Sequence, residues 1–263
     1  MTIERRLSPE EEELLAKKAE LDGLTDQLGH KALELQTLLA EIDSFFRIYN
    51  AAVEPKVVES KRLKALIAQA IYGLHPTEST RAESGAASAS AEEAARDQQG
   101  QPQTPSTEAP TFTPSPELRS LFITIVKQAH PDLSRDEADR LRRTEFMVRV
   151  NQAYKDGDEA ALRALADEWE AGGGPVEDKS IGEQLVRVIR QIADVRRRLV
   201  DVDAEIEEVR NSDDYSLVMQ AEEARANGRD LIAEHVAQMD EHIEGLNAKI
   251  DAVRDELIAI YGS

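Results

Sequence analysis

The regular spacing of apolar residues toward the end of the chain restricts its possible folds most strongly. Across residues 181–209 the apolar positions follow steps of three and four without interruption, and the same spacing resumes across 232–260. This spacing places one apolar stripe on each of two helices and is typical of a coiled-coil seam. The pattern breaks near Asp213 and again near Gly228. We therefore predict a C-terminal coiled-coil hairpin over 180–263 with its turn at one of these breaks, and a parallel dimer of each seam is the alternative.

A less regular heptad seam lies near the N-terminus. Apolar residues recur at every seventh position across residues 7–49, and Ser8 and Glu11 have the spacing of a helix-starting capping box. Pro55 should kink or end this helix because proline lacks a backbone N–H group. The sequence predicts an N-terminal helical coiled-coil region over 1–76, in which the part after Pro55 either folds back or continues the helix past a kink.

Charge and composition narrow the possible functions. The chain of 263 residues is 32% charged and only 4% aromatic, which fits long exposed helices better than one thick core. A formal charge of −20 argues against binding to nucleic acid or to an anionic membrane surface. The chain has no cysteine, so it has no disulfide and no thiolate metal site. It also shows no signal peptide and no membrane-spanning apolar run, so we expect a soluble cytoplasmic protein.

Two segments have the composition of linkers. Residues 77–114 are rich in Ser, Ala, Gly, Gln, Glu, Pro and Thr, and Phe112 is nearly their only apolar anchor. Such a segment cannot bury enough surface to offset its ordering entropy, so we predict a disordered linker with at most a transient helix over 86–95. The Gly-rich segment 172–179 predicts a hinge.

Residues 115–171, between the two linkers, have a helical pattern with a sharp bend at its centre. The first helix should end at His130, because the residue before a proline avoids the α-helical region and Pro131 cannot donate a hydrogen bond. Ser134 and Glu137 have the spacing of a capping box for a second helix, which should end at Gly157. The residues expected to face inward from the second helix are Leu141, Met147, Val150 and Tyr154. A short third helix would present Leu162, Leu165 and Trp169 on one face.

Two antiparallel amphipathic helices joined by a His-Pro-Asp bend resemble helices II and III of a J-domain, the module by which DnaJ-type co-chaperones act on DnaK-type ATPase chaperones. The resemblance depends on His130-Pro131-Asp132, on the preceding run 118–122, and on Val-Asn-Gln-Ala-Tyr at 150–154, which is similar to the family's Ile-Asn-Glu-Ala-Tyr. The Asp-Tyr-Tyr-x-x-Leu-Gly segment of the family's first helix is not evident before Glu117. We expect the short third helix to fill its place.

The resemblance implies a set of partner-binding residues. His130, Pro131 and Asp132 would engage the partner ATPase and promote its ATP hydrolysis, with Asp132 pairing with a positive group on that chaperone. Arg119 and Lys127, the basic residues of the helix before the bend, would meet an acidic chaperone surface. The protein would then have no active site, cofactor or metal of its own.

The histidines outside the bend give no stronger prediction. A metal site at His130 and Asp132 is disfavoured, because two ligands across a proline bend leave a coordination shell mostly unfilled. His235 and His242 lie seven residues apart beside a predicted seam, where we expect a solvated helix flank.

Together these features predict an all-α protein in which long coiled-coil helices and helical hairpins flank a small J-domain-like unit on flexible tethers. The predicted function is recruitment and stimulation of a DnaK-type chaperone, with the coiled coils serving self-association or the binding of a client or scaffold. The alternative is a structural coiled-coil scaffold that carries a degenerate, inactive J-like unit. For the bend taken alone, the simplest alternative is an ordinary turn between helices.

Overall fold

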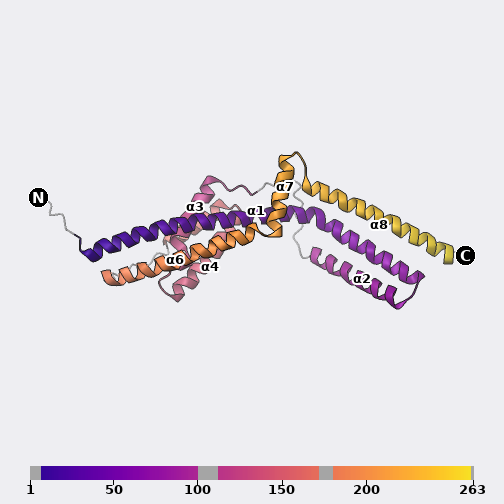
Figure 1. The fold of residues 1–263 in the computed structure, drawn as a ribbon, viewed down its shortest axis with the longest axis horizontal. Coiled ribbons are helices and arrows are strands. Elements are labelled where there is room, and N and C mark those ends of the chain that lie inside the picture. The colour runs from indigo at the N-terminus through magenta and orange to yellow at the C-terminus, as the bar shows by residue number, and fades with distance from the viewer. Residues whose placement is uncertain (1–6, 100–111, 172–179, 262–263) are drawn as a thin grey trace. The chain divides into compact units, whose positions relative to one another are not determined.

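The computed structural model describes residues 7–99, 112–171 and 180–261, and it is helical throughout, with no strand in these ranges (Figure 1). The all-α prediction is confirmed. The long helices are α1 (Pro9–Leu74), α6 (Ile181–Arg210) and α8 (Leu231–Tyr261). The shorter ones are α2 (Glu78–Gln99), α3 (Pro116–Ala129), the 3-10 turn η1 (Pro131–Leu133), α4 (Glu137–Lys155), α5 (Glu159–Ala171) and α7 (Asp213–Ala226). The chain forms two compact units, Met1–Ile42 with Pro110–Ser216 and Asp43–Ala109 with Leu217–Ser263.

Helix α1 starts at the predicted capping box and contributes to both units. Ser8 N donates to Glu11 Oε2 at 2.8 Å, and Glu11 N donates to Ser8 Oγ at 3.2 Å. Pro55 does not end the helix, so the second of the two alternatives, continuation past the proline, is the one observed. Val53 and Ala65 on either side of Pro55 are buried. Burial of the apolar face of a helix outweighs the local cost of one proline.

In the first unit the N-terminal part of α1 pairs with α6. The two helices share two buried clusters, formed by Leu28, Leu35, Leu38, Val195, Val202 and Ile206 and by Leu14, Val188 and Ile192. Cross-helix ion pairs join Glu20 to Arg196 at 2.5 Å and Glu34 to Arg210 at 2.7 Å. Residue numbers rise together along both helices, so this α1–α6 coil is parallel.

This pairing corrects the predicted C-terminal hairpin over 180–263. That hairpin would join the seam of α6 to the seam of α8, but α6 buries its seam against α1 instead. A heptad pattern marks an apolar stripe without specifying which other stripe covers it. The sequence alone therefore left the partner of α6 open.

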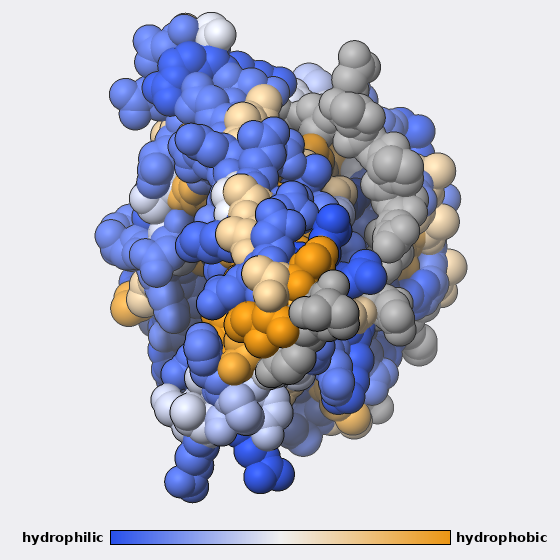
Figure 2. Space-filling model, turned by 90° about the vertical axis from the view of Figure 1, so that its right-hand side faces the viewer, coloured by the Kyte–Doolittle hydropathy of each residue, from blue (hydrophilic) through white to orange (hydrophobic). Residues whose placement is uncertain are grey.

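In the second unit the later part of α1 packs with α2 and α8. Lys56 forms an ion pair with Asp240 at 2.7 Å, and Gln69 Nε2 donates to Ser88 Oγ at 3.1 Å. Most side chains on the face in Figure 2 are hydrophilic and surround a limited group of apolar ones. No helix within the described ranges has the length and apolar character needed to cross a bilayer.

Helix α2 lies where the sequence predicts a disordered linker, so the prediction for 77–114 is wrong over this helix. The backbone N–H groups of Thr77 and Thr80 each donate to the other residue's hydroxyl, at 3.1 and 3.2 Å, which begins the helix. The segment is rich in alanine, the residue with the highest helix propensity, and Ala94 is buried. Residues 100–111 and the predicted hinge 172–179 lie outside the described residues.

Candidate functional site

The segment that resembles a J-domain folds as three helices, α3, α4 and α5, around one apolar core. The rings of Phe122 and Tyr154 lie 4.7 Å apart and connect α3 to α4. Leu162 and Leu165 of α5 are buried in the same core, and α5 packs on both other helices. The predicted short third helix is therefore present and covers the pair. We call α3, η1, α4 and α5 the three-helix unit.

Leu141 departs from the predicted inward face of α4. Its side chain is 61% exposed, whereas Met147, Val150 and Tyr154 are buried as predicted. The buried face of α4 begins at Arg143, and Leu141 lies two positions earlier, which turns it away from the core by about half a helical turn.

The helix-start residue of α4 also differs from the prediction. Asp136, not Ser134, caps the helix, because its Oδ1 accepts from Asp139 N at 2.8 Å. Ser134 N instead donates to Pro131 O at 3.0 Å and closes η1, so this turn delays the start of α4.

The predicted end of α4 at Gly157 is confirmed. Gly157 has a φ of +67°. Asp158 N donates to Ala153 O at 2.9 Å and Gly157 N to Tyr154 O at 3.0 Å, the two bonds of a Schellman motif.

The His-Pro-Asp bend is held by its own hydrogen bonds. His130 N donates to Val126 O at 3.1 Å, and the extended ψ of 137° at His130 is the conformation expected before a proline. His130 Nδ1 accepts from Asp132 N at 3.2 Å, and Leu133 N donates to His130 O at 3.0 Å. Because Nδ1 accepts a hydrogen bond, Nε2 carries the proton of the neutral ring.

Arg143 supports the bend from α4, and sequence reasoning missed it. Its side chain is only 8% exposed. Its Nη1 donates to Gln128 O at 2.8 Å and its Nε to Asp139 Oδ2 at 2.9 Å. Its guanidinium carbon also lies 5.0 Å from the centre of the Trp169 ring on α5. The sequence indicated this role of Arg143 only weakly, because arginine on a helix is normally a surface residue.

The bend is covered by α6. Gln191 Nε2 donates to Leu133 O at 2.9 Å, and the side chain of Leu133 packs against the α1–α6 coil. The side chains of His130 and Asp132 are only 12% and 27% exposed. The bend, which the resemblance to a J-domain would present outward to a partner chaperone, is therefore largely covered in this structure.

Burial controls the charges at the bend. Burial, together with the smaller effect of the positive charges of Arg198 and Arg143, lowers the pKa of His130 from 6.5 to about 4. Burial raises the pKa of Asp132, which Arg198 partly offsets. Asp132 Oδ2 lies 3.5 Å from His130 Nδ1 and is buried without a hydrogen-bond partner. At neutral pH the imidazole is uncharged, so two acceptors face each other there and no ion pair forms.

The three-helix unit is docked on α1 rather than held only by tethers. Ala32 and Leu33 of α1 pack against its core. Gly29 allows a close approach to α3, since a Cβ there would lie 3.1 Å from Ile123 Cγ2.

The structure places the predicted basic residues at two different points of α3. Lys127 lies near the bend and forms an ion pair with Asp26 of α1. Arg119 is exposed and lies eleven residues before His130, about 16 Å away along the helix axis. The bend residues and Lys127 are therefore close together, while Arg119 lies at the other end of α3.

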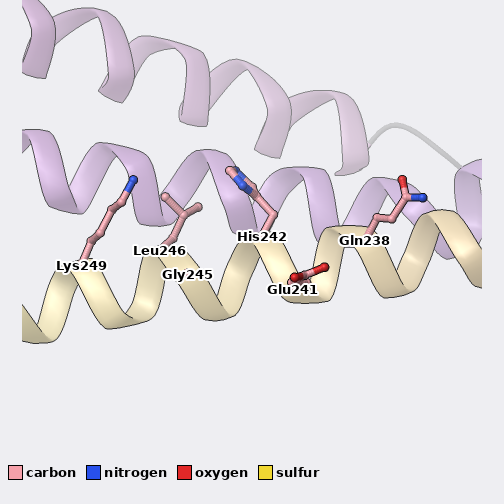
Figure 3. Close-up of a pocket in the computed structure, with 6 residues that line it drawn as sticks. All are labelled: Gln238, Glu241, His242, Gly245, Leu246 and Lys249. Carbon is pink, nitrogen blue, oxygen red and sulfur yellow. The ribbon is translucent and has the colours of Figure 1, made fainter.

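A shallow groove lies in the second unit. It has a volume of about 360 Å³ and runs along α8. Its lining residues are Gln238, Glu241, His242, Gly245, Leu246 and Lys249. His242, Leu246 and Lys249 point toward the neighbouring helix α1 (Figure 3).

The remaining histidines show no metal-site geometry. His235 differs from the predicted solvated flank, because its Nδ1 lies 3.2 Å from Tyr49 OH. No group of three or more metal-ligating side chains occurs among the residues that the structure describes.

Comparison of the chain with protein-family models, curated proteins and solved structures found no match. The resemblance to a J-domain therefore depends on this chain's own residues and their geometry.

Proposed function

We propose that the protein is a co-chaperone of the J-domain type, which recruits a DnaK-type chaperone in the cytoplasm and stimulates its ATPase through the bend at His130, Pro131 and Asp132. The observation that supports this most directly is that two packed helices hold a fixed His-Pro-Asp turn between them. The hydrolysis would take place in the partner chaperone. The proposal needs no cofactor or metal in this chain.

Asp132 is the group best suited to contact the partner. Its Oδ2 has an unused capacity to accept a hydrogen bond. A positive side chain of the chaperone would supply a charge-assisted hydrogen bond and remove the cost of a buried acceptor without a partner. Lys127 lies near the same end of α3. It would attract an acidic surface of the chaperone if it exchanged its ion pair with Asp26 for one with the chaperone.

The long helices would hold whatever the recruited chaperone acts on. The α1–α6 coil and the second unit supply extended polar surfaces for a client, a scaffold protein or a second copy of the chain. Holding the ATPase beside such a ligand raises its effective concentration there.

A structural coiled-coil scaffold with an inactive J-like unit is the second candidate. The cover of α6 over the bend favours it, since a turn used only for packing has no need to be accessible. In that case Leu133 and Gln191 would serve only to attach the three-helix unit to the coil.

Steady-state ATP turnover by a DnaK-type chaperone separates the two candidates. We expect the full-length protein to stimulate turnover and Asp132→Asn to abolish the effect. Asp136→Asn is the matched control, because asparagine replaces aspartate well as a helix cap and the change lies in the same loop. If the wild type gives no stimulation, or Asp132→Asn stimulates equally, the co-chaperone proposal fails and the scaffold remains.

A further inference from the structure

One stripe of α6 lies on the His-Pro-Asp bend. Gln191, Asp194 and Arg198 are half-buried and follow steps of three and four, so they share one helix face, while Ala193 and Arg197 beside them are exposed. Gln191 donates to Leu133 O at 2.9 Å. The charges of Asp194 and Arg198 act on the Asp132 carboxyl group. The turn that would meet a chaperone is therefore already occupied by a helix of the same chain.

We propose that this stripe of α6 masks the bend, so that productive contact with a DnaK-type chaperone requires the bend to separate from α6. The inference rests on the co-chaperone function proposed above and adds an intramolecular regulation to it. The masked state is the one that this structure describes.

The contact between the bend and α6 resembles a reversible surface contact more than a permanent core. It is formed by the hydrogen bond from Gln191 to Leu133 O and by the apolar side chain of Leu133, which packs at the edge of the α1–α6 coil. When α6 covers the bend, Asp132 Oδ2 is buried without a hydrogen-bond partner, and this raises the free energy of the covered state. The core of the three-helix unit lies elsewhere, around Phe122 and Tyr154, so the bend can leave α6 without loss of that core.

A chaperone with a positive group at its docking surface would compete directly with α6. It would bind the released Asp132 carboxylate, which α6 buries without a hydrogen bond. In the closed state the bend lies on α6, and in the open state it is separated from α6. Binding of the chaperone would shift the population toward the open state by as much as the chaperone prefers that state.

The test uses the full chain with Gln191→Glu, and Gln184→Glu as its control. A carboxylate at position 191 cannot donate to Leu133 O and repels it, so we expect the open state to gain roughly tenfold in population relative to the closed one. Gln184 lies on the same helix and faces Lys18, with Lys18 Nζ 3.4 Å from its Oε1. The same change of charge there leaves the bend covered. Gln191→Ala, which removes the hydrogen bond without adding a charge, serves if the glutamate variant does not fold.

Two measurements are made on each variant. Solvent exposure of the Leu133 methyl groups, measured by NMR with a soluble paramagnetic probe, reports separation of the bend from α6 without any chaperone, because Leu133 packs against the α1–α6 coil. ATP turnover by a DnaK-type chaperone at a limiting concentration of this protein reports productive contact.

Greater exposure of Leu133 together with stronger stimulation by Gln191→Glu, and neither change in Gln184→Glu, supports the masking. Unchanged exposure of Leu133 overturns it, because α6 would then not hold the bend. Greater exposure with stimulation equal to that of the wild type also overturns masking while the co-chaperone function stands. Greater exposure with no stimulation by either protein overturns the co-chaperone function itself, and the masking with it.

Discussion

Thr37 Oγ1 on α1 and Tyr154 OH on α4 lie 2.8 Å apart, and this hydrogen bond joins the long helix to the three-helix unit. Tyr154 is fully buried, and burial raises the pKa of its phenol. The same tyrosine is the last residue of the Val-Asn-Gln-Ala-Tyr run that suggested a J-domain. In this chain it contributes both to the core of the three-helix unit and to its attachment to α1.

Replacement of this tyrosine tests the attachment. Tyr154→Phe keeps the ring contacts with Phe122 and removes only the hydroxyl group. Thr37 Oγ1 still lies 2.8 Å from Leu33 O, so it keeps one partner. We expect a loss of about 1 kcal/mol in the free energy of unfolding, measured by urea denaturation. Tyr72→Phe on an exposed part of α1 is the control, and equal effects of the two changes would contradict the prediction.

Arg143 provides a test of the bend's support. Arg143→Met removes the donors to Gln128 O and Asp139 and leaves both acceptors partly buried, so we expect a loss of about 2–4 kcal/mol in unfolding free energy. Arg140→Met is the matched control, because Arg140 pairs with Glu137 on the exposed side of the same helix. A denaturation midpoint for Arg143→Met as high as that of the control would show that the buried guanidinium does not hold the bend.

The buried imidazole predicts a pH dependence. His130 takes up a proton near pH 6.5 when unfolded but only near pH 4 when covered. Between these values the unfolded state binds more protons, so stability is fully present above pH 6.5 and falls as the pH drops toward 4. The facing charges are Arg143 from α4 and Arg198 from α6.

Asp132, whose pKa is raised, opposes this effect at the acidic end, because its covered form takes up a proton more readily than its unfolded form. An NMR titration of the imidazole should give an apparent pKa of about 4. In Gln191→Ala the value should move toward 6.5. A titration near 6.5 in the unaltered chain would refute the buried environment of His130.

Two glycines of α1 form a natural comparison. A Cβ at Gly23 meets nothing within 4 Å, so Gly23→Ala should stabilise the helix by about 0.5–1 kcal/mol. Gly29→Ala gains the same helix propensity but brings its Cβ to 3.1 Å from Ile123 Cγ2, which crowds the contact of α1 with α3. Thermal unfolding should therefore show a smaller gain, or a loss, at position 29. Equal gains at both positions would mean that α1 does not approach α3 so closely.

Local signals in the sequence predicted several helix boundaries, although not the start of α4. Ser8 with Glu11 forms the predicted capping box, and Gly157 ends α4. These features depend on residues within one or two turns of each other, and side-chain type largely determines them. The apolar spacing also predicted the buried faces of α1 and α6.

Features that depend on distant residues were not predictable in this way. The seam of α6 could have packed against α8, against a second copy or against α1, because each offers a similar apolar stripe. Arg143 looked like a surface residue until the neighbouring carbonyl oxygens were in place. The cover over His130 depends on Gln191, more than fifty residues later in the chain, and no short motif records that contact.

The parallel α1–α6 coil has a consequence for the synthesis of the chain. Two of its ion pairs, Glu20–Arg196 and Glu34–Arg210, join residues 176 positions apart, so the apolar stripe of α1 leaves the ribosome long before its partner helix exists. At about 5–20 residues per second, translation needs roughly 10–35 s to supply that partner. Throughout this interval the nascent stripe, which includes Leu28 and Leu35, is open to other apolar surfaces, including those of chaperones that meet chains during translation.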